Sequence, residues 1–324
     1  SMNNISRLEV LHSPTPESPG SALAGSVNMI PRSAFDRSRP VFNYSVFLMM
    51  RDNDRHLFSK TPGPRWINTR KVHPGFDFSY IKPVNDRFGF TLSGGMTKQY
   101  TEEARTANTW RGAGAATNGL TATTAATQYP DTTPDKPYLT DYVVEDGGKH
   151  TERTSAAATV DYKLSRNDRL SFSTELTFFA SPLNQRTLSF FVNRVAPGDF
   201  TTTSTHGQVG RGEIRNASAS RNHQRTKYMP TLTYRHEGPI WKAESGLGYS
   251  NERLHFRSTD KGFLNNVTST RQNVTVNFDE IFYLRPGLIT VTDGTTGAPV
   301  DPYNLSNYVL STANATYRRT TDVK

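Results

Sequence analysis

The sequence of 324 residues has no cysteine and no long apolar run. The absence of cysteine excludes a disulfide framework, a cysteine-ligated zinc site and a thiol nucleophile. A membrane-spanning helix needs about 18 or more consecutive apolar residues, and the longest notable apolar run here covers only residues 46–50. Hydrophobic residues make up 34% of the chain, which is too few to favour two ordinary soluble domains with thick cores.

Aromatic residues and basic charge are what the chain does contain. It is 11% aromatic, with 18 Phe and 14 Tyr, so it lacks the aromatic-poor composition of a disordered protein. Lys and Arg number 38 against 29 Asp and Glu, which gives a net charge of +9. Acids are in excess over residues 101–152 and bases over residues 200–227. Because this sorting suits separate loops better than one basic groove, we expect no nucleic-acid partner.

Apolar and polar residues alternate with a period of two in many segments, which predicts β-strands. A first strand is expected over residues 42–50. Three hairpins are expected to pair residues 75–81 with 88–92, 160–164 with 170–178, and 228–234 with 241–249, and a fourth, less regular one pairs 273–283 with 288–292. The connections within these hairpins are short and rich in Asn, Asp, Ser or Gly, which suits tight turns.

The connections between the hairpins are predicted to be much longer than the turns within them. They cover residues 51–74, 101–153, 181–226 and about 257–272 and are rich in Thr, Gly, Asn and charge. Structureless loops of this length are uncommon in compact domains, whereas transmembrane β-barrels combine short turns at one end with long loops at the other. Such a barrel needs only one thin apolar band, flanked by aromatic residues. The pattern predicts an all-β fold whose antiparallel up-and-down hairpins form part of a transmembrane β-barrel.

A soluble β-sandwich or Greek-key domain is the alternative fold, because it also shows alternation and turn signals. Its strands usually recur about every 8–12 residues, which the long connections argue against. A sandwich buries Phe76, Phe90, Phe172 and Leu247 between two sheets, whereas a barrel places apolar residues on its outer face. These four side chains therefore discriminate between the two folds.

Two short motifs precede the first predicted strand. One contains Ile5, Arg7, Leu8, Glu9, Val10 and Pro14, and the other contains Ala22, Ala24, Gly25, Val27, Asn28 and Ile30. Together they resemble the end of the plug domain of TonB-dependent outer-membrane transporters, which typically reads I-x-R-I-E-V-x-x-G-P and then G-A-x-G-G-x-I-N-I. The sequence departs from that pattern at Ser13 and Ser21, where the family has glycine. Beyond residue 30 the resemblance is architectural only.

The resemblance implies two domains, with residues 1–40 closing the plug and residues 41–324 forming the N-terminal part of the barrel with its long extracellular loops. A plugged transporter barrel has about 22 strands, and far fewer are predicted here, so we expect a fragment. In the family, the residues matching Arg7, Glu9, Gly25 and Asn28 are implied to lock the plug against the barrel wall. The simpler alternative is that these four residues only fold the plug.

The resemblance further implies a bacterial outer-membrane location, in contact with lipid and lipopolysaccharide. The implied function is active uptake of an extracellular nutrient such as a siderophore or an oligosaccharide. TonB supplies the energy through segments that lie outside this chain. The alternative function is that of a soluble β-rich surface binding or adhesin domain, for which the plug-like start is a coincidence.

Residues that carry chemistry are scattered. The eight histidines form no H-x-x-x-H pair on a plausible helix, and the S-x-x-K sequence at residues 258–261 lacks its supporting motifs. We therefore expect no enzyme, no catalytic residue, no metal site and no cofactor.

Ligand binding is predicted in the long connections instead. Trp110, Arg111, Tyr129, Tyr138 and Tyr142 lie in the acidic segment, where their rings and polar groups could hold a sugar or a metal chelate. The alternative is that these aromatics pack the connections together or lie at a membrane interface. The bases over residues 211–227 could contact lipopolysaccharide phosphates, or they could form a solvated face.

Overall fold

The computed structural model describes residues 5–11, 26–31, 33–51, 56, 58–61, 70–112, 129–257 and 264–323. Strands account for 70% of the chain and helix for 2%. The strands form antiparallel sheets with up-and-down connections. The predicted all-β class and the antiparallel arrangement are therefore confirmed.

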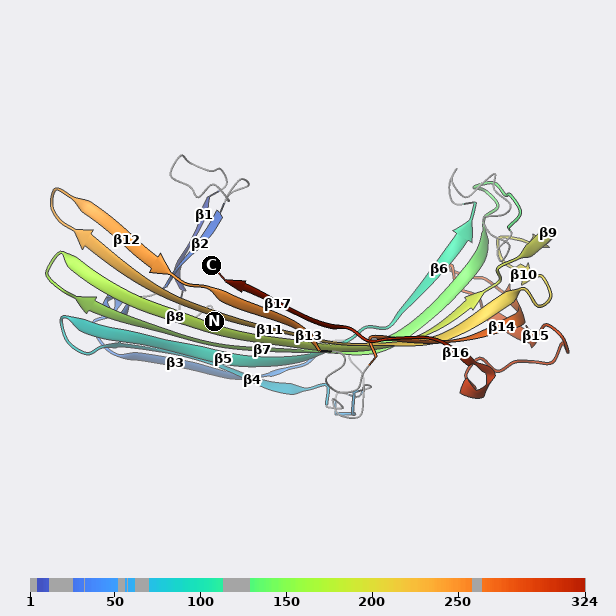
Figure 1. Ribbon diagram of the computed structural model, residues 1–324, viewed down its shortest axis with the longest axis horizontal. Coiled ribbons are helices and arrows are strands. Elements are labelled where there is room, and N and C mark those ends of the chain that lie inside the picture. The colour runs from blue at the N-terminus through green and yellow to red at the C-terminus, as the bar shows by residue number, and fades with distance from the viewer. Residues whose placement is uncertain are drawn as a thin grey trace.

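A separate two-stranded hairpin begins the described chain. β1 (Ile5–Leu11) pairs with β2 (Ser26–Pro31) in a sheet of its own, and Figure 1 shows this hairpin standing apart from the main sheet. The described parts of the two plug-like motifs are thus strands that pair with each other. A single 3-10 turn, η2 (Ala34–Asp36), follows, and the Ser33 hydroxyl caps it by accepting a hydrogen bond from the Phe35 backbone N at 3.3 Å.

The main sheet has 15 strands and is not closed over the described residues. Its principal path runs through β3 (Val41–Met49), β4 (His73–Pro83), β5 (Phe88–Glu102), β7 (Tyr138–Lys163), β8 (Asp168–Phe191), β11 (Gly212–Glu237), β14 (Asn266–Asp279), β10 (Thr205–Gly207) and β9 (Val195–Phe200). The strands that pair beside this path are β6 (Arg105–Arg111), β12 (Lys242–Gly248), β13 (Asn251–Arg257), β15 (Leu288–Asp293), β16 (Val309–Asn314) and β17 (Tyr317–Val323). Figure 1 shows them running together as one long, curved sheet.

All four predicted hairpins are present, as β4–β5, β7–β8, β11–β12 and β14–β15. Side chains fix two of the turns. The Asn85 amide oxygen accepts hydrogen bonds from the backbone N of Arg87 (2.9 Å) and of Phe88 (2.7 Å). The Ser165 hydroxyl accepts bonds from the backbone N of Asn167 and Asp168, both at 3.1 Å. Asn and Ser close these turns by replacing backbone partners, as their composition predicted.

The prediction of long connections was wrong for most of residues 181–226 and for the parts of residues 101–153 that belong to β5, β6 and β7. β7, β8 and β11 are 26, 24 and 26 residues long. Their polar parts stay paired because the backbone ladder needs no apolar side chain, and cross-strand ion pairs such as Arg186–Asp146 (2.6 Å) add to it. Strand segments with polar residues on both faces show no alternation of apolar and polar residues, so the sequence did not predict them as strands.

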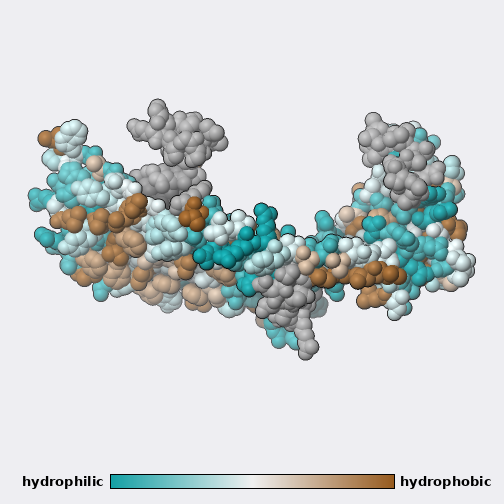
Figure 2. Space-filling model, in the orientation of Figure 1, coloured by the Kyte–Doolittle hydropathy of each residue, from teal (hydrophilic) through white to brown (hydrophobic). Residues whose placement is uncertain are grey.

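Burial divides the main sheet into two regions. At the end of the sheet away from the turns of the β4–β5, β7–β8 and β11–β12 hairpins, the strands β7, β8 and β11 join a hydrophobic cluster whose side chains are closed to solvent. Its buried members are Tyr138, Leu139, Tyr142, Phe190, Val192, Val195, Ile214, Val274, Val276, Phe278, Ile281 and Val291. Near the short turns the sheet exposes large apolar side chains instead. Figure 2 shows them gathered over the left-hand part of the molecule, which carries the turns of the β4–β5, β7–β8 and β11–β12 hairpins, whereas the β14–β15 turn lies at the cluster end.

The exposed side chains argue against the β-sandwich alternative. Phe172 is 43% exposed and Leu247 is 74% exposed, Phe76 is exposed as well, and Phe90 is half-buried. Within the described chain no second sheet covers these residues. A sandwich buries them, so the structure favours a single-layer sheet.

Candidate functional site

The apolar residues near the short turns form a continuous band on one face of the sheet. Neighbouring strands are in register there, and one row crosses five strands through Phe90, Val160, Phe172, Leu232 and Leu247. Residues two apart on a strand point to the same face, so the rows on either side extend the same surface. The result is an apolar surface that is several strands wide.

The band is limited along the strands. On β8 it runs from Leu170 to Phe178, which is about 26 Å at about 3.3 Å per residue. Near the turns, Tyr162 and Tyr234 lie in the same row as Leu170, so aromatic rings border the band there. One row beyond Phe178, the same face carries the ion pair between Lys98 Nζ and Glu152 Oε2 at 3.5 Å. The apolar surface therefore ends in polar groups.

The opposite face of the same strands is polar and holds the segment before β3. Asp161 on β7 is only 2% exposed. Its carboxylate accepts three hydrogen bonds, from Ser33 Oγ (2.9 Å), the backbone N of Ala34 (2.9 Å) and Ser171 Oγ (2.5 Å). A buried carboxylate is stable only when its oxygens are satisfied in this way. Asp161 thus anchors residues 33–36 to the sheet.

Close packing reinforces this anchor. Ala34 is buried, and a Cβ added to Gly89 on β5 would lie 2.6 Å from the Ala34 Cβ. Glycine at position 89 therefore permits the close approach. The Lys163 Nζ lies 4.1 Å from the centroid of the Phe35 ring, within the range of a cation–π contact. Any movement of the β1–β2 hairpin against the sheet must therefore occur N-terminal to Ser33.

The predicted locking residues lie in or beside the β1–β2 hairpin. Arg7 pairs with Ile30 and Glu9 with Asn28 across the two strands. Gly25 lies outside the described residues, as do the side chains of Arg7, Glu9 and Asn28. Their locking role stays a prediction.

The five predicted ligand residues lie together, but in and around the hydrophobic cluster. Tyr138 is 0% and Tyr142 is 7% exposed, and Trp110 and Tyr129 pack against the cluster partly buried. The Tyr138 ring stacks on Phe200 with the centroids 4.0 Å apart, and Arg111 pairs with Asp131 at 3.6 Å. This arrangement fits the alternative that the aromatics pack the connections together, because Tyr138 and Tyr142 present almost no surface to a ligand.

Burial also changes the ionisation of groups beside the cluster. Desolvation raises the pKa of Tyr138 to about 12 and raises the pKa of Tyr129 as well. It raises the pKa of Asp141 to about 6, although a hydrogen bond with Thr109 and the charge of Arg215 both oppose the shift. Asp141 is therefore a carboxyl group that is held in an environment unfavourable to its charge.

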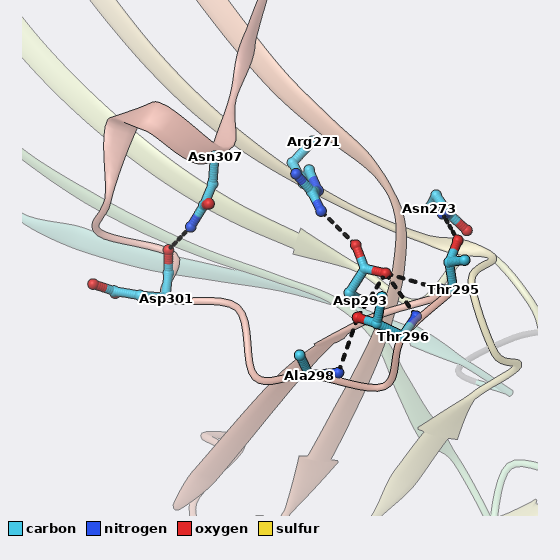
Figure 3. Close-up of polar contacts among 8 residues, drawn as sticks. All are labelled: Arg271, Asn273, Asp293, Thr295, Thr296, Ala298, Asp301 and Asn307. Carbon is cyan, nitrogen blue, oxygen red and sulfur yellow. Dashed lines mark hydrogen bonds and ion pairs between the residues drawn. The ribbon is translucent and has the colours of Figure 1, made fainter.

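A tightly bonded turn follows β15 at the same end of the sheet (Figure 3). Asp293 Oδ1 accepts hydrogen bonds from the backbone N of Thr295 and Thr296, both at 2.9 Å, and Asp293 Oδ2 accepts one from Arg271 Nη2 at 2.5 Å. The backbone donors of Thr296 and Thr295 lower the pKa of Asp293 to about 2. Since its oxygens are committed to the turn, this carboxylate has a structural role. Across the described residues, no three acidic or histidine side chains gather in a group that could hold a metal ion.

Comparisons with known proteins identify no relative. No family model matches the chain, and neither a curated protein nor a solved structure is similar to it. Within the part of the chain that the structure describes, no helix has the length and apolarity needed to cross a membrane. Any functional assignment must therefore rest on the geometry of the chain itself.

Asp161 is the functional candidate that sequence reasoning missed. It appeared only as one of the polar residues that alternate with Val160 and Tyr162 in a predicted hairpin. One sequence signal could have found it. Asp161 is an acidic residue among neutral hydroxyl residues on one face of the sheet, because Thr159, Ser171 and Ser173 surround it in the ladder. Its partners Ser33 and Ala34 are more than a hundred residues away, so the sequence did not reveal them.

Proposed function

We propose that this chain forms part of the wall of a TonB-dependent transporter in the bacterial outer membrane, and that it serves the uptake of an extracellular nutrient. The observation that carries the proposal is the exposed apolar band on a single-layer sheet, which covers residues 170–178 on β8. Transmembrane β-strands are tilted and need about 9–11 residues to cross the apolar region, and aromatic residues lie at its edges. In the membrane, lipid covers this apolar band, whose exposure to water is unfavourable.

The polar face supports the same proposal. In a transporter of this kind, the lumen side is polar and carries a plug that is connected to the first strand of the wall. Here the β1–β2 hairpin precedes β3, and Asp161 anchors the segment between them to the polar face. In this proposal the hairpin is the end of the plug, further strands complete the wall, and TonB acts on segments outside this chain.

A soluble surface-binding domain is the competing function. The hydrophobic cluster favours it, because the side chains of that cluster are closed to solvent by the chain itself. This function requires a second protein layer over the apolar band. The two functions therefore differ in what lies against Phe172 and its neighbours.

Spin labelling tests the membrane assignment, and the cysteine-free chain allows single cysteines to be introduced cleanly. The protein is reconstituted in phosphatidylcholine vesicles and labelled at one of positions 172, 173, 175 or 176 on β8. Labels at 172 and 176 are expected to be accessible to oxygen and protected from a water-soluble nickel chelate, and labels at 173 and 175 to show the reverse. An Arg186→Cys label, beyond the band, serves as the exposed control. Nickel access at 172 and 176 would rule out a lipid-facing band.

Transport is tested separately in the bacterium that produces the protein. Deleting the gene is expected to abolish TonB-dependent growth on one limiting nutrient from a panel of ferric siderophores, cobalamin and oligosaccharides. Unchanged growth on every member of the panel would contradict uptake as the function.

A further inference from the structure

An open pocket of about 610 Å³ lies on β11, β14 and β16, beyond the end of the apolar band. Its lining includes Glu213, Arg215, Thr268, Thr270, Gln272 and Ser311. The register of β8 and β11 is unbroken from Glu213 to His236. Glu213 and Arg215 therefore share the face of Thr233, which is the polar face that carries the anchor. The volume lies within the range of about 300–1,000 Å³ that is typical of small-molecule sites.

The lining residues are held in place by the sheet. Glu213 lies opposite Gln272, and Arg215 lies opposite Thr270, in the β11–β14 ladder. The Thr270 and Ser311 hydroxyls are 3.0 Å apart, and Ser311 Oγ donates to the Thr268 carbonyl oxygen at 2.9 Å. These contacts fix the hydroxyl groups of Thr270 and Ser311 on paired strands, so a ligand would meet them already ordered.

The charges in the pocket are already compensated. The guanidinium of Arg215 contacts the carboxylate of Glu213 and lies 4.6 Å from the centroid of the Phe191 ring. The same guanidinium acts on Asp141, whose carboxyl group is desolvated. Two acidic side chains therefore share one basic side chain, and an anionic ligand would find no free positive charge there.

We propose that this pocket binds an uncharged oligosaccharide. Small-molecule sites are usually lined mainly by apolar groups, whereas this lining consists largely of hydroxyl, amide and carboxylate groups. Such groups match the donors and acceptors of sugar hydroxyls, and Val309, which lies opposite Thr270, offers apolar surface to the C–H face of a sugar ring. The proposal rests on the proposed function, because it names the class of nutrient and selects it over an anionic ferric chelate.

The test is ligand-observed saturation-transfer NMR on the reconstituted protein. The neutral probes are maltotriose, cellotriose, mannotriose and xylotriose, and the anionic probes are trigalacturonate and a ferric tricatecholate. At least one neutral trisaccharide is expected to bind, and neither anionic probe is. The double variant Thr270→Val/Gln272→Leu is expected to weaken this binding at least tenfold. Thr233→Val, on the same face of β11 but outside the pocket, is the matched control and is expected to bind normally.

Glu213→Gln gives a second, opposite readout. Removing this carboxylate takes away the acidic group that contacts Arg215 directly and leaves only Asp141 beside it, so trigalacturonate is expected to gain binding while the protein stays folded. The proposal is overturned if no neutral trisaccharide binds, if the double variant binds like the unaltered protein, or if an anionic probe binds unaltered protein at least as well as the neutral ones. The spin-label experiment separates the two hypotheses. If oxygen and nickel access alternate between the labels on β8 but no sugar binds, only the pocket assignment is rejected. If a sugar binds but label access does not alternate, only the membrane wall is rejected.

Discussion

β8 carries apolar side chains at both of its ends, and the two ends differ in what covers them. Phe172 and Phe190 are separated by an even number of residues on a strand with unbroken register, so they share a face. Phe172 is 43% exposed, whereas Phe190 is 4% exposed. At the Phe190 end, β9, β14 and β15 contribute side chains that close a core. The comparison shows that alternation specifies an apolar face but not what covers it, and the described residues cover this face at one end only.

Truncating an aromatic side chain at each end should give the largest effect and the sharpest contrast. Phe278→Ala in the closed core is expected to destabilise the protein by about 3–5 kcal/mol, since the cavity adds to the lost transfer free energy. Phe172→Ala in the band is expected to cost less, about 1.5–3 kcal/mol in lipid, because only the transfer contribution is lost. Chemical denaturation of the reconstituted protein, followed by tryptophan fluorescence, measures both. Equal costs would mean that protein rather than lipid covers Phe172.

The same contrast explains how much of the fold the sequence predicts. Alternation found the hairpins around the band because one face of each strand is apolar and the other polar, as at Val160 and Asp161. Alternation missed the N-terminal half of β7, where Glu145, Asp146 and Lys149 lie in a strand whose composition is typical of a polar loop. The pocket was missed for the same reason, since Glu213 and Gln272 meet only through the register of β11 and β14. Long-range register is a property of the whole sheet, and local composition does not encode it.

Two partly or fully buried carboxyl groups on β7 extend the comparison to electrostatics. Asp141 lies near the closed core, where desolvation raises its pKa to about 6. Between about pH 4 and 6 the folded state therefore binds more protons than the unfolded state, so stability falls as the pH rises through this window. Asp141→Asn removes the penalty and is expected to stabilise the protein at pH 7.5 by up to about 3 kcal/mol, at about 1.4 kcal/mol per pKa unit.

The pH dependence of that gain is the check. Thermal unfolding at pH 7.5 and at pH 3.5 should show the advantage of Asp141→Asn at the higher pH and its disappearance at the lower one. Asp146→Asn is the control, because Asp146 pairs with Arg186 on the exposed surface and is expected to change stability by less than about 1 kcal/mol. A gain that persists at pH 3.5 would show that Asp141 acts through packing rather than charge.

Asp161, at the other end of β7, should give the smallest and most local effect. Its carboxylate is buried, but three hydrogen bonds stabilise its charge. The charge of Asp141, in contrast, is disfavoured by desolvation. Asp161→Asn weakens the bonds to Ser33 and Ala34 by about 1.5 kcal/mol, and amide exchange at Ala34 is expected to become about tenfold faster. Glu175→Gln, on the polar face of β8, is the matched control and should leave that exchange unchanged. If exchange at Ala34 does not respond to Asp161→Asn, then packing against Gly89 holds the segment, and the anchor is steric rather than electrostatic.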